Sequence, residues 1–223
     1  MSIPLSVVII SKNEEKFIKD AILSANFADE VLLLDSGSID KTCLIASELG
    51  AKVITQDWLG FGQQKNKAID LAKNNWVFVL DSDERITSAL KLEICNIMSN
   101  PMFDGYLVAR LNNFFGKNIK TCGLYPDYTM RLFNKKKGRF NDVNVHESVI
   151  LEGNVGKLKS HMIHLAYDSF DEFIVKQKRY ARLSSKNNNI FKALVSPCWV
   201  FIKIFFIKLG FLEGRRGFLI AKG

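Results

Sequence analysis

The most informative stretch of this 223-residue chain is Trp76-Val-Phe-Val-Leu80, followed at once by Asp81-Ser82-Asp83. A short apolar run rich in β-branched and aromatic residues predicts a strand that is buried on both faces. In an open α/β sheet, ligands bind at the carboxyl ends of the strands. The two carboxylates at positions 81 and 83 are therefore placed to reach one divalent cation or a ribose together. Alternatively, they cap a helix that begins near Thr87, since Asp and Ser are favoured at that position.

The segments before this stretch alternate between short apolar runs and helical patterns. Strands separated by helices of such length form right-handed βαβ units around a mainly parallel sheet. The sequence therefore predicts an α/β, Rossmann-like fold for this half. We expect strands at Leu5–Ile10, Glu30–Leu34, Val53–Thr55 and Trp76–Leu80, and helices at Glu14–Ser24, Ile39–Leu49 and Gln63–Lys73.

Polar loops follow two other strands of this series. Asp35-Ser-Gly-Ser-Ile-Asp40 comes after the second strand, and Ser11-Lys-Asn-Glu14 comes after the first. Gly37 permits a tight turn, Ser38 or Asp40 can cap the next helix, and Asp35 can accept hydrogen bonds from a base or a sugar hydroxyl. A helix-capping loop without a ligand is the alternative for this loop alone. Three polar loops at successive strand ends predict a nucleotide-binding crevice.

The same loops argue against two common nucleotide-binding classes. No Gly-x-Gly-x-x-Gly follows the first strand and no Walker lysine loop is present, which disfavours a dinucleotide oxidoreductase and a P-loop enzyme. Beyond Asp83 we expect a helix at Ser88–Met98 and antiparallel strands at Tyr106–Phe115 and Thr129–Asn134. A basic amphipathic helix is expected at Ser169–Leu183.

Charge and cysteine content narrow the possible partners. Residues 1–105 carry a net charge of −5 and residues 106–223 a net charge of +13. This asymmetry predicts an anionic partner for the second half, which can be membrane lipid, a phosphorylated glycan or nucleic acid. The four cysteines are scattered, without a Cys-x-x-Cys pair, so reduced thiols explain them better than disulfides or zinc. No signal peptide is visible.

The most apolar segment is Ile190–Leu212, which combines Phe, Trp and Ile with several lysines. Its length of ~20 residues would permit a membrane span, but lysines in the middle count against one. A helix lying on the membrane surface suits Lys, Trp and Phe together. Packing against the protein's own core is the remaining alternative.

Several motifs resemble those of the family 2 glycosyltransferases of GT-A fold. They are Ser6-Val-Val-Ile-Ile-Ser-Lys-Asn-Glu-Glu15, Val31-Leu-Leu-Leu-Asp-Ser-Gly-Ser-Ile-Asp40 and Val79-Leu-Asp-Ser-Asp-Glu84. Trp58-Leu-Gly-Phe-Gly-Gln-Gln-Lys-Asn66 and the pair His146-Glu147 are similar to a narrower branch, which contains the β-1,4-glucosyltransferases of the lipopolysaccharide inner core. The chain departs from the family at Ser36, where a second aspartate is usual.

This resemblance implies an inverting bacterial hexosyltransferase. The expected donor is a UDP-hexose, with UDP-glucose first, and the expected cofactor is Mg²⁺ or Mn²⁺. The expected acceptor is a lipopolysaccharide core or another lipid-linked glycan. The protein would then be cytoplasmic and peripheral on the inner face of the cytoplasmic membrane, attached through its C-terminal segment.

The resemblance also divides the chain and assigns residues to the donor. A GT-A domain would span 1–165, with a nucleotide-sugar half (1–100) and an acceptor half (101–165), and a basic amphipathic helical extension would span 166–223. The side chains implied for the donor all lie in the first half: Ser11, Asn13, Glu14 and Asp35 on the nucleoside, Lys65 near the diphosphate or sugar, and Asp81 and Asp83 on ribose and the metal-bound diphosphate.

Inversion by a single displacement needs a base for the acceptor hydroxyl. Glu147 is our first choice because His146 stands beside it, and Asp127, in the loop before a predicted strand, is the second. A surface or salt-bridged carboxylate is the alternative for Glu147. Arg131, which lies in an alternating strand, is expected to face the acceptor. His164 is also assigned to the acceptor, by the resemblance of His164-Leu-Ala-Tyr-Asp-Ser-Phe170 to the same branch.

Two other functions remain open from the sequence. A nucleotidyltransferase also uses paired acids and a metal on an α/β sheet, but it usually has a Gly-rich phosphate loop where this chain has Ser-Lys-Asn-Glu. A basic module that binds nucleic acid without catalysis would require basic residues interleaved with exposed aromatics over one face. Acidic loops at the strand ends would repel phosphate unless a metal intervened. We therefore expect no nucleic-acid partner.

Overall fold

The computed structural model describes residues 3–142, 147–167, 169–170, 173–175 and 198–222. The chain divides into two compact units, each made of two segments. The first unit comprises Met1–Arg110 and Tyr128–Ile163, and the second comprises Leu111–Asp127 and His164–Gly223. The stretch 111–127 thus belongs with the C-terminal part of the chain, although in sequence it lies between two segments of the first unit.

The first unit holds most of a nine-stranded sheet with the order β3-β2-β1-β4-β8-β6-β11-β5, and β7 (Lys117–Asn118) pairs with β6. Its parallel part consists of β1 (Ile3–Ser11), β2 (Ala28–Asp35), β3 (Lys52–Thr55) and β4 (Trp76–Asp81). β8 (Asp127–Asn134) joins β4 in the antiparallel direction. The expected α/β fold, with a mainly parallel sheet and antiparallel additions, is confirmed.

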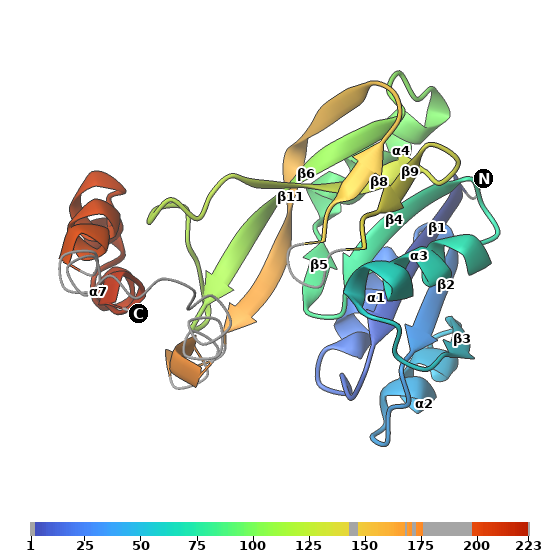
Figure 1. Cartoon of the computed structure of the whole chain (residues 1–223), viewed down its shortest axis with the longest axis horizontal. Coiled ribbons are helices and arrows are strands. Elements are labelled where there is room, and N and C mark those ends of the chain that lie inside the picture. Colours follow the sequence, from blue (N-terminus) through green and yellow to red (C-terminus); the bar gives the residue numbers. More distant parts are fainter. Residues whose placement is uncertain (1–2, 143–146, 168, 171–172, 176–197, 223) are drawn as a thin grey trace. The chain divides into compact units, whose positions relative to one another are not determined.

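Helices cover both faces of the parallel strands (Figure 1). α1 (Ile18–Ala25), α2 (Thr42–Glu48) and α4 (Ser88–Ser99) contribute to the core on one face, and α3 (Phe61–Leu71) contributes to the core on the other. Because successive side chains of a strand alternate between faces, Phe78 and Leu80 join the first core and Val77 and Val79 the second. Burial on both faces explains the unbroken apolar runs.

The register of these strands brings their carboxyl ends to one edge of the sheet. Ser11 at the end of β1 pairs with Asp35 at the end of β2, and Ile10 pairs with Asp81 at the end of β4. Asp35 in turn pairs with Thr55 at the end of β3. The three polar loops predicted to assemble therefore start side by side.

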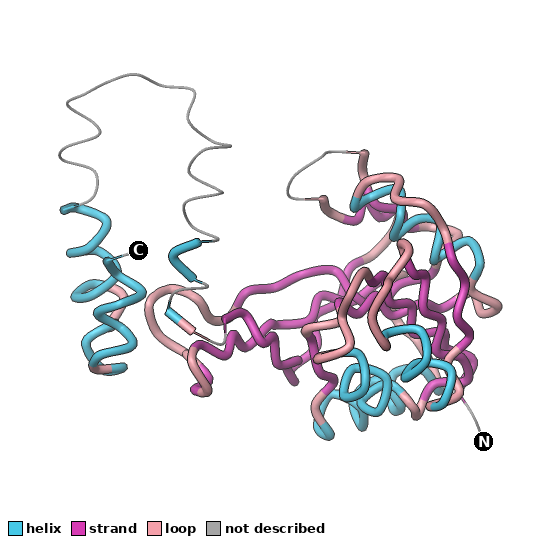
Figure 2. The backbone as a smooth tube through the Cα atoms, turned by 90° about the horizontal axis from the view of Figure 1, so that it is seen from below, coloured by secondary structure: helices cyan, strands magenta, loops and turns pink. Residues whose placement is uncertain are grey.

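β6 (Gly105–Phe114) and β11 (Val155–Tyr167) are neighbouring long strands that continue from the first unit into the second (Figure 2). The sequence missed three strands of three residues each, because so few residues carry too little periodicity to be recognised. They are β5 (Glu84–Ile86), β9 (Gly138–Phe140) and β10 (Val149–Leu151), of which β9 and β10 form a separate antiparallel pair.

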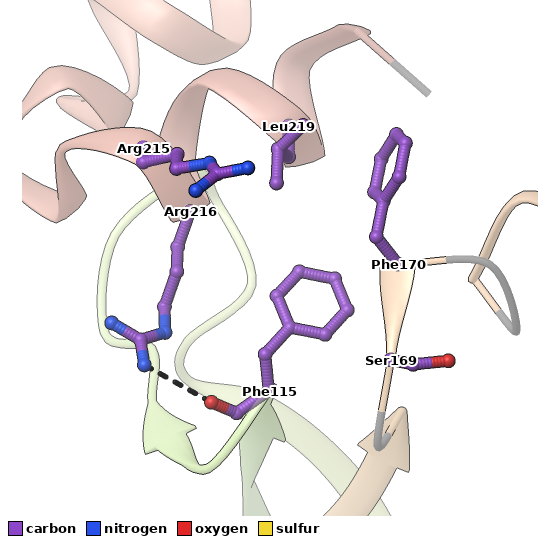
Figure 3. Close-up of a pocket in the computed structure, with 6 residues that line it drawn as sticks. All are labelled: Phe115, Ser169, Phe170, Arg215, Arg216 and Leu219. Carbon is purple, nitrogen blue, oxygen red and sulfur yellow. Dashed lines mark hydrogen bonds between the residues drawn. The ribbon is translucent and has the colours of Figure 1, made fainter.

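The second unit has a core rich in aromatic side chains, in which Phe114 and Phe173 both pack against Tyr167, with ring centroids 5.0 Å apart in each pair. A hollow of about 400 Å³ lies beside this core (Figure 3). Arg216 donates a hydrogen bond to the backbone oxygen of Phe115 at 3.1 Å in its wall. The hollow is lined by Phe115, Ser169, Phe170, Arg215, Arg216 and Leu219, none of which is a predicted site residue.

The described C-terminal segment contains a π-helix (Lys203–Ile207), a short 3-10 helix (Gly210–Glu213) and α7 (Arg215–Lys222). Across the described part of the chain, no helix is long and apolar enough to span a bilayer. Most of the predicted helix Ser169–Leu183, and residues 190–197 of the apolar segment, lie outside the described residues. The expectation of helices near the C-terminus is met from residue 198 onward.

Candidate active site

The Asp35 turn is held together by local hydrogen bonds. Oδ1 of Asp35 accepts from the hydroxyls of Ser11 (2.9 Å) and Ser38 (2.5 Å), and Oδ2 accepts from the backbone N–H groups of Gly37 (2.9 Å) and Ser38 (2.7 Å). Asp35 is 1% exposed. Burial by itself would raise the pKa of this carboxyl, but the hydrogen bonds from Ser38 and Ser11 outweigh it and lower the pKa. Gly37 has a φ of 81°, as the predicted tight turn requires.

The loop after β1 is fastened to this turn. Asn13, with a φ of 57°, accepts a hydrogen bond from the backbone of Ile39 and donates its own N–H to Ser38. The N–H of Glu14 donates to the hydroxyl of Thr42 at 2.8 Å. Ser11, Asn13 and Asp35 are therefore joined in one hydrogen-bond network through Ser38, and Glu14 is held beside it by Thr42 of α2. These bonds pre-organise this part of the edge.

The carboxylate of Asp81 lies between two cations. Its Oδ1 is 3.1 Å from Nζ of Lys65, and its Oδ2 is 2.9 Å from Nη2 of Arg131. Burial would raise the pKa of Asp81, yet Lys65 and Arg131 hold it far below its ordinary value. Asp81 therefore stays ionised, and its carboxylate contacts two cations before any ligand binds.

A second, fully buried carboxylate supports this pair. Glu84 is 0% exposed; its Oε1 lies 2.6 Å from Nη2 of Arg131, and its Oε2 accepts the N–H of Asp81 at 3.1 Å. Burial would lower the pKa of Arg131, but Glu84 and Asp81 raise it above the ordinary value. Arg131 therefore binds both carboxylates from a buried position at the end of β4. The sequence predicted it as an acceptor contact, whereas its side chain is only 5% exposed and its guanidinium binds Asp81 and Glu84.

Lys65 connects Asp81 to Glu147. Its Nζ is 2.9 Å from Oε1 of Glu147, and it lies over the ring of Phe140 at 5.3 Å from the centroid. The side chain of Lys65 is 6% exposed, that of Glu147 is 17% exposed and that of Asp81 is 29% exposed. Although burial opposes it, the charge of Asp81, with a further contribution from Glu147, raises the pKa of Lys65. Lys65 thus remains a cation between the two carboxylates.

Asp83 follows on the loop between β4 and β5 and is half-buried. The alternative that these acids cap the next helix is wrong, because Thr87 accepts the N–H of Leu90 and is itself the N-cap of α4. Asp40, in contrast, accepts the N–H of Thr42, the first residue of α2, although the N-cap position itself is occupied by Lys41.

The first unit thus gathers most of the predicted donor residues, together with Glu147. Asp127 and His164 belong to the second unit, where Nδ1 of His164 lies 2.6 Å from Oδ1 of Asn112. His146 lies outside the described residues. The roles predicted for these three side chains stay predictions.

Sequence reasoning missed Glu84 and Gln64. Gln64 is fully buried; its amide donates to the hydroxyl of Ser36 (3.0 Å) and to the backbone of Gln56 (3.3 Å), and its Oε1 accepts the N–H of Leu59 (3.2 Å). Glu84 stands among polar residues, between Asp83 and Arg85, so the sequence gives no signal that its side chain is buried. One partner of each residue lies far away in sequence: Arg131 is 47 positions from Glu84, and Ser36 is 28 positions from Gln64.

The donor set suits a metal ion that is shared with a substrate. Within the described residues, no three His, Cys, Asp or Glu side chains are grouped so as to hold a metal ion by themselves. Mg²⁺ is usually bound by one or two carboxylates plus substrate phosphates. Asp83, two residues from an Asp81 that already pairs with Lys65 and Arg131, fits that pattern.

Comparisons with known proteins agree with this arrangement. The model of the family described as Glycosyl transferase family 2 matches residues 6–150, more than half of the chain. An uncharacterized glycosyltransferase of Rickettsia bellii is 34% identical over 96% of this chain and 80% of its own length. The lipopolysaccharide core biosynthesis glycosyltransferase LpsC of Rhizobium meliloti is 29% identical over 98% of this chain and 87% of its own length.

The fold is similar to that of two solved structures of S. aureus TarS. Residues 1–349 of S. aureus TarS superpose with a TM-score of 0.52 at 16% identity, covering 95% of this chain and 74% of that one. A second structure of the same fragment, in complex with UDP, gives the same TM-score and covers 94% of this chain and 75% of that one. The sheet, the acidic edge and these matches lead to one conclusion: the chain belongs to glycosyl transferase family 2, with a GT-A fold.

Proposed function

We propose that this glycosyltransferase moves a hexose, glucose first, from a UDP-sugar to a hydroxyl of a lipopolysaccharide core or another lipid-linked glycan, with inversion. The observation that carries the proposal is the position of Lys65. One buried cation contacts Asp81 at the end of β4 at 3.1 Å and Glu147 at 2.9 Å. A carboxylate suited to the donor and a carboxylate suited to the acceptor are thereby fixed on either side of one charge.

The donor side would hold the diphosphate. Negative charge develops on the leaving diphosphate as the sugar departs, and a fixed cation such as Lys65 stabilises that charge. Mg²⁺ or Mn²⁺, bound by Asp83 and the phosphate oxygens, would add a Lewis acid at the same place. Asp81 can accept hydrogen bonds from the ribose hydroxyls, and the contacts of Lys65 and Arg131 with its carboxylate reduce the negative charge that it places near the phosphates.

Glu147 would act as the general base. The acceptor oxygen forms a bond to the anomeric carbon, the bond from that carbon to the diphosphate oxygen breaks, and the hydroxyl proton passes to the Glu147 carboxylate. Lys65 orients this carboxylate through Oε1. A partly exposed base, with 17% of its side chain accessible, is open to an incoming hydroxyl. Asp127 is the second candidate for this role, and His146 and His164 are the candidates for acceptor contacts.

The nature of donor and acceptor is supported by the relatives. LpsC, which is similar over nearly the whole chain, is named for lipopolysaccharide core biosynthesis, and a TarS fragment of like fold was solved with UDP. Family membership favours sugar transfer over a nucleotidyltransferase or a basic module that binds nucleic acid.

Substitution of Glu147 tests the mechanism. Glu147→Gln keeps the shape of the side chain and removes its basicity, so we expect binding of UDP with Mn²⁺ to persist while transfer falls at least about 100-fold. Glu152→Gln, an exposed glutamate of the same unit, is the matched control and should transfer sugar normally. Release of UDP from UDP-glucose, with core oligosaccharide as acceptor, measures the rate.

Two results would contradict the proposal. Near-normal transfer by Glu147→Gln removes Glu147 as the base and turns attention to Asp127. A wild-type protein that UDP fails to stabilise against heat, with or without Mn²⁺, removes the UDP-sugar itself, because a ligand of the native state must raise the melting temperature.

We also propose that residues 198–222 rest on the inner face of the cytoplasmic membrane. Nine large apolar side chains are exposed there, and five cations accompany one acid, Glu213, which is paired with Lys117. We expect the protein to pellet with vesicles that contain phosphatidylglycerol but not with vesicles of phosphatidylcholine alone. Equal pelleting with both kinds of vesicle, or pelleting with neither, would contradict the proposed membrane contact. The exposed apolar residues are Trp199, Val200, Ile202, Phe206, Ile207, Leu209, Phe211, Leu212 and Phe218.

A further inference from the structure

Three large apolar side chains are exposed within one short stretch of the first unit. The exposed fractions are 46% for Trp58, 43% for Leu59 and 52% for Phe61. A single exposed apolar residue is ordinary, but a group of them marks a surface that meets a partner. Their neighbours in the fold indicate which partner.

The stretch lies at the carboxyl edge of the sheet, beside the Asp35 turn. It follows β3, whose last residue Thr55 pairs with Asp35, and the N–H of Gln56 donates to the backbone oxygen of Asp35 at 2.9 Å. Phe61 begins α3, and Lys65 lies four residues further along it. Residues four apart share one face of a helix. The aromatic pair therefore lies close to both the Asp35 turn and the ion pairs of Lys65.

The pair is held in a fixed geometry. The ring centroids of Trp58 and Phe61 are 4.8 Å apart with their planes at 86°. Gly60 between them has a φ of 101°, which residues with a Cβ rarely adopt. Buried Gln64 bonds to the backbone at Leu59 and Gln56 and to Ser36 of the Asp35 turn. Such support keeps side chains oriented before a ligand arrives.

The Asp35 turn, by contrast, has little capacity left for a base. A carboxylate offers about four acceptor positions, and Asp35 uses four on Ser11, Gly37 and Ser38. The hydroxyl of Ser36, where the family usually has an aspartate, already accepts the amide of Gln64. A nucleobase at this turn therefore needs a different source of binding energy.

We propose that Trp58 and Phe61 form a stacking platform for the nucleobase of the donor. The inference rests on the proposed nucleotide-sugar donor and adds which side chains hold its base. Aromatic side chains stack on the face of any base without requiring hydrogen bonds. The strand order favours the base over the acceptor sugar as occupant, because β3 and β2 lie on the side of β1 away from β4 and the antiparallel strands.

Ligands that do and do not carry a base test the platform. Trp58→Ala should weaken the binding of UDP with Mg²⁺ at least about fivefold, as expected for the loss of one stacked ring. Binding of inorganic pyrophosphate with Mg²⁺, which has no base, should stay within about twofold of wild type. Trp58→Phe should keep most of the UDP affinity while losing most of the tryptophan fluorescence change that UDP causes.

The matched control is Phe103→Ala. Phe103 is 39% exposed and forms a perpendicular pair with Tyr106, like Phe61 with Trp58, but it lies at the opposite edge of the sheet. There Asn134 pairs with Trp76 at the start of β4 and donates its N–H to the backbone of Asp104. The UDP affinity of Phe103→Ala should therefore equal that of wild type.

The outcomes separate the platform from the proposed function. Wild-type protein that binds UDP, with Trp58→Ala and Phe61→Ala binding it equally well, overturns the platform and leaves the function standing. Equal losses of UDP and pyrophosphate affinity also overturn it, because the substitution then acts on the diphosphate site. A rise in acceptor KM with unchanged UDP affinity reassigns the aromatic pair to the acceptor. Wild-type protein that binds no nucleotide defeats both proposals.

Discussion

Two aspartates at the same edge of the sheet are stabilised in opposite ways. Asp35, at the end of β2, receives only neutral donors, and three of its four hydrogen bonds come from residues two or three positions further along the chain. Asp81, at the end of β4, is balanced by two cations, Lys65 and Arg131, which lie 16 and 50 positions away. One site is built locally, and the other depends on the whole fold.

The difference has a consequence for stability. Neutral donors satisfy Asp35 without placing another charge in the interior. The Asp81 cluster instead buries Arg131 with two carboxylates, and removing one member of such a cluster leaves an uncompensated charge in a poorly solvated place. We therefore expect the Asp81 cluster to be the more sensitive of the two to a single substitution.

Arg131→Met should cause the largest loss. The substitution removes the 2.6 Å contact between Arg131 and the carboxylate of Glu84, which is 0% exposed. Glu84 is then left with Arg110, at 3.9 Å. The free energy of unfolding in urea at pH 7 should fall by about 3–5 kcal/mol. Adding Glu84→Gln should recover part of the loss, since the uncompensated charge disappears.

Arg139→Met is the control for Arg131→Met. Arg139 also binds a carboxylate through two contacts, to Asp70 at 2.6 and 2.9 Å, but both side chains are 52% exposed. An exposed pair of this kind contributes about 0–1 kcal/mol. If both arginine substitutions cost the same small amount, burial does not govern the Asp81 cluster and the comparison with Asp35 fails.

The same contrast explains what could be read from the sequence. The strands and their parallel direction follow from local apolar runs separated by helices. The meeting of the three loops follows because the carboxyl ends of parallel strands lie at one edge of the sheet. The Asp35 turn was recognisable because Gly37 and Asp40 act on near neighbours. The pairing of Arg131 with Glu84 joins residues 47 apart, and alternation within a strand does not indicate which face is buried.

The assignment of residues 111–127 to the second unit could not be predicted from the sequence either. No change in composition marks either end of this stretch, and its place is set by contacts with residues far away, such as the hydrogen bond from Cys122 to the backbone of Lys208. Glu147, in contrast, was chosen as the base because His146 stands beside it in the sequence, and the structure places Oε1 of Glu147 2.9 Å from Nζ of Lys65.

Asp35→Asn should have the smaller effect. The amide keeps the size of the side chain but replaces one acceptor oxygen by a donor, which then faces the N–H or hydroxyl donors of Gly37 and Ser38. A loss of about 1–3 kcal/mol in the free energy of unfolding at pH 7 is expected. Asp57→Asn, at an exposed aspartate just beyond β3, should change stability little.

The pH dependence of that loss identifies its origin. Because the folded protein lowers the pKa of Asp35, ionised Asp35 contributes stability that is present above the unfolded pKa, about 3.9, and is lost as the pH falls through the folded value. The difference in the free energy of unfolding between wild type and Asp35→Asn should therefore become smaller below about pH 4. Asp81 and Asp40 also have lowered pKa values, but they are present in both proteins and cancel in the difference. A gap that stays constant from pH 7 to pH 3 would mean that the charge of Asp35 contributes nothing and that the turn depends on shape alone.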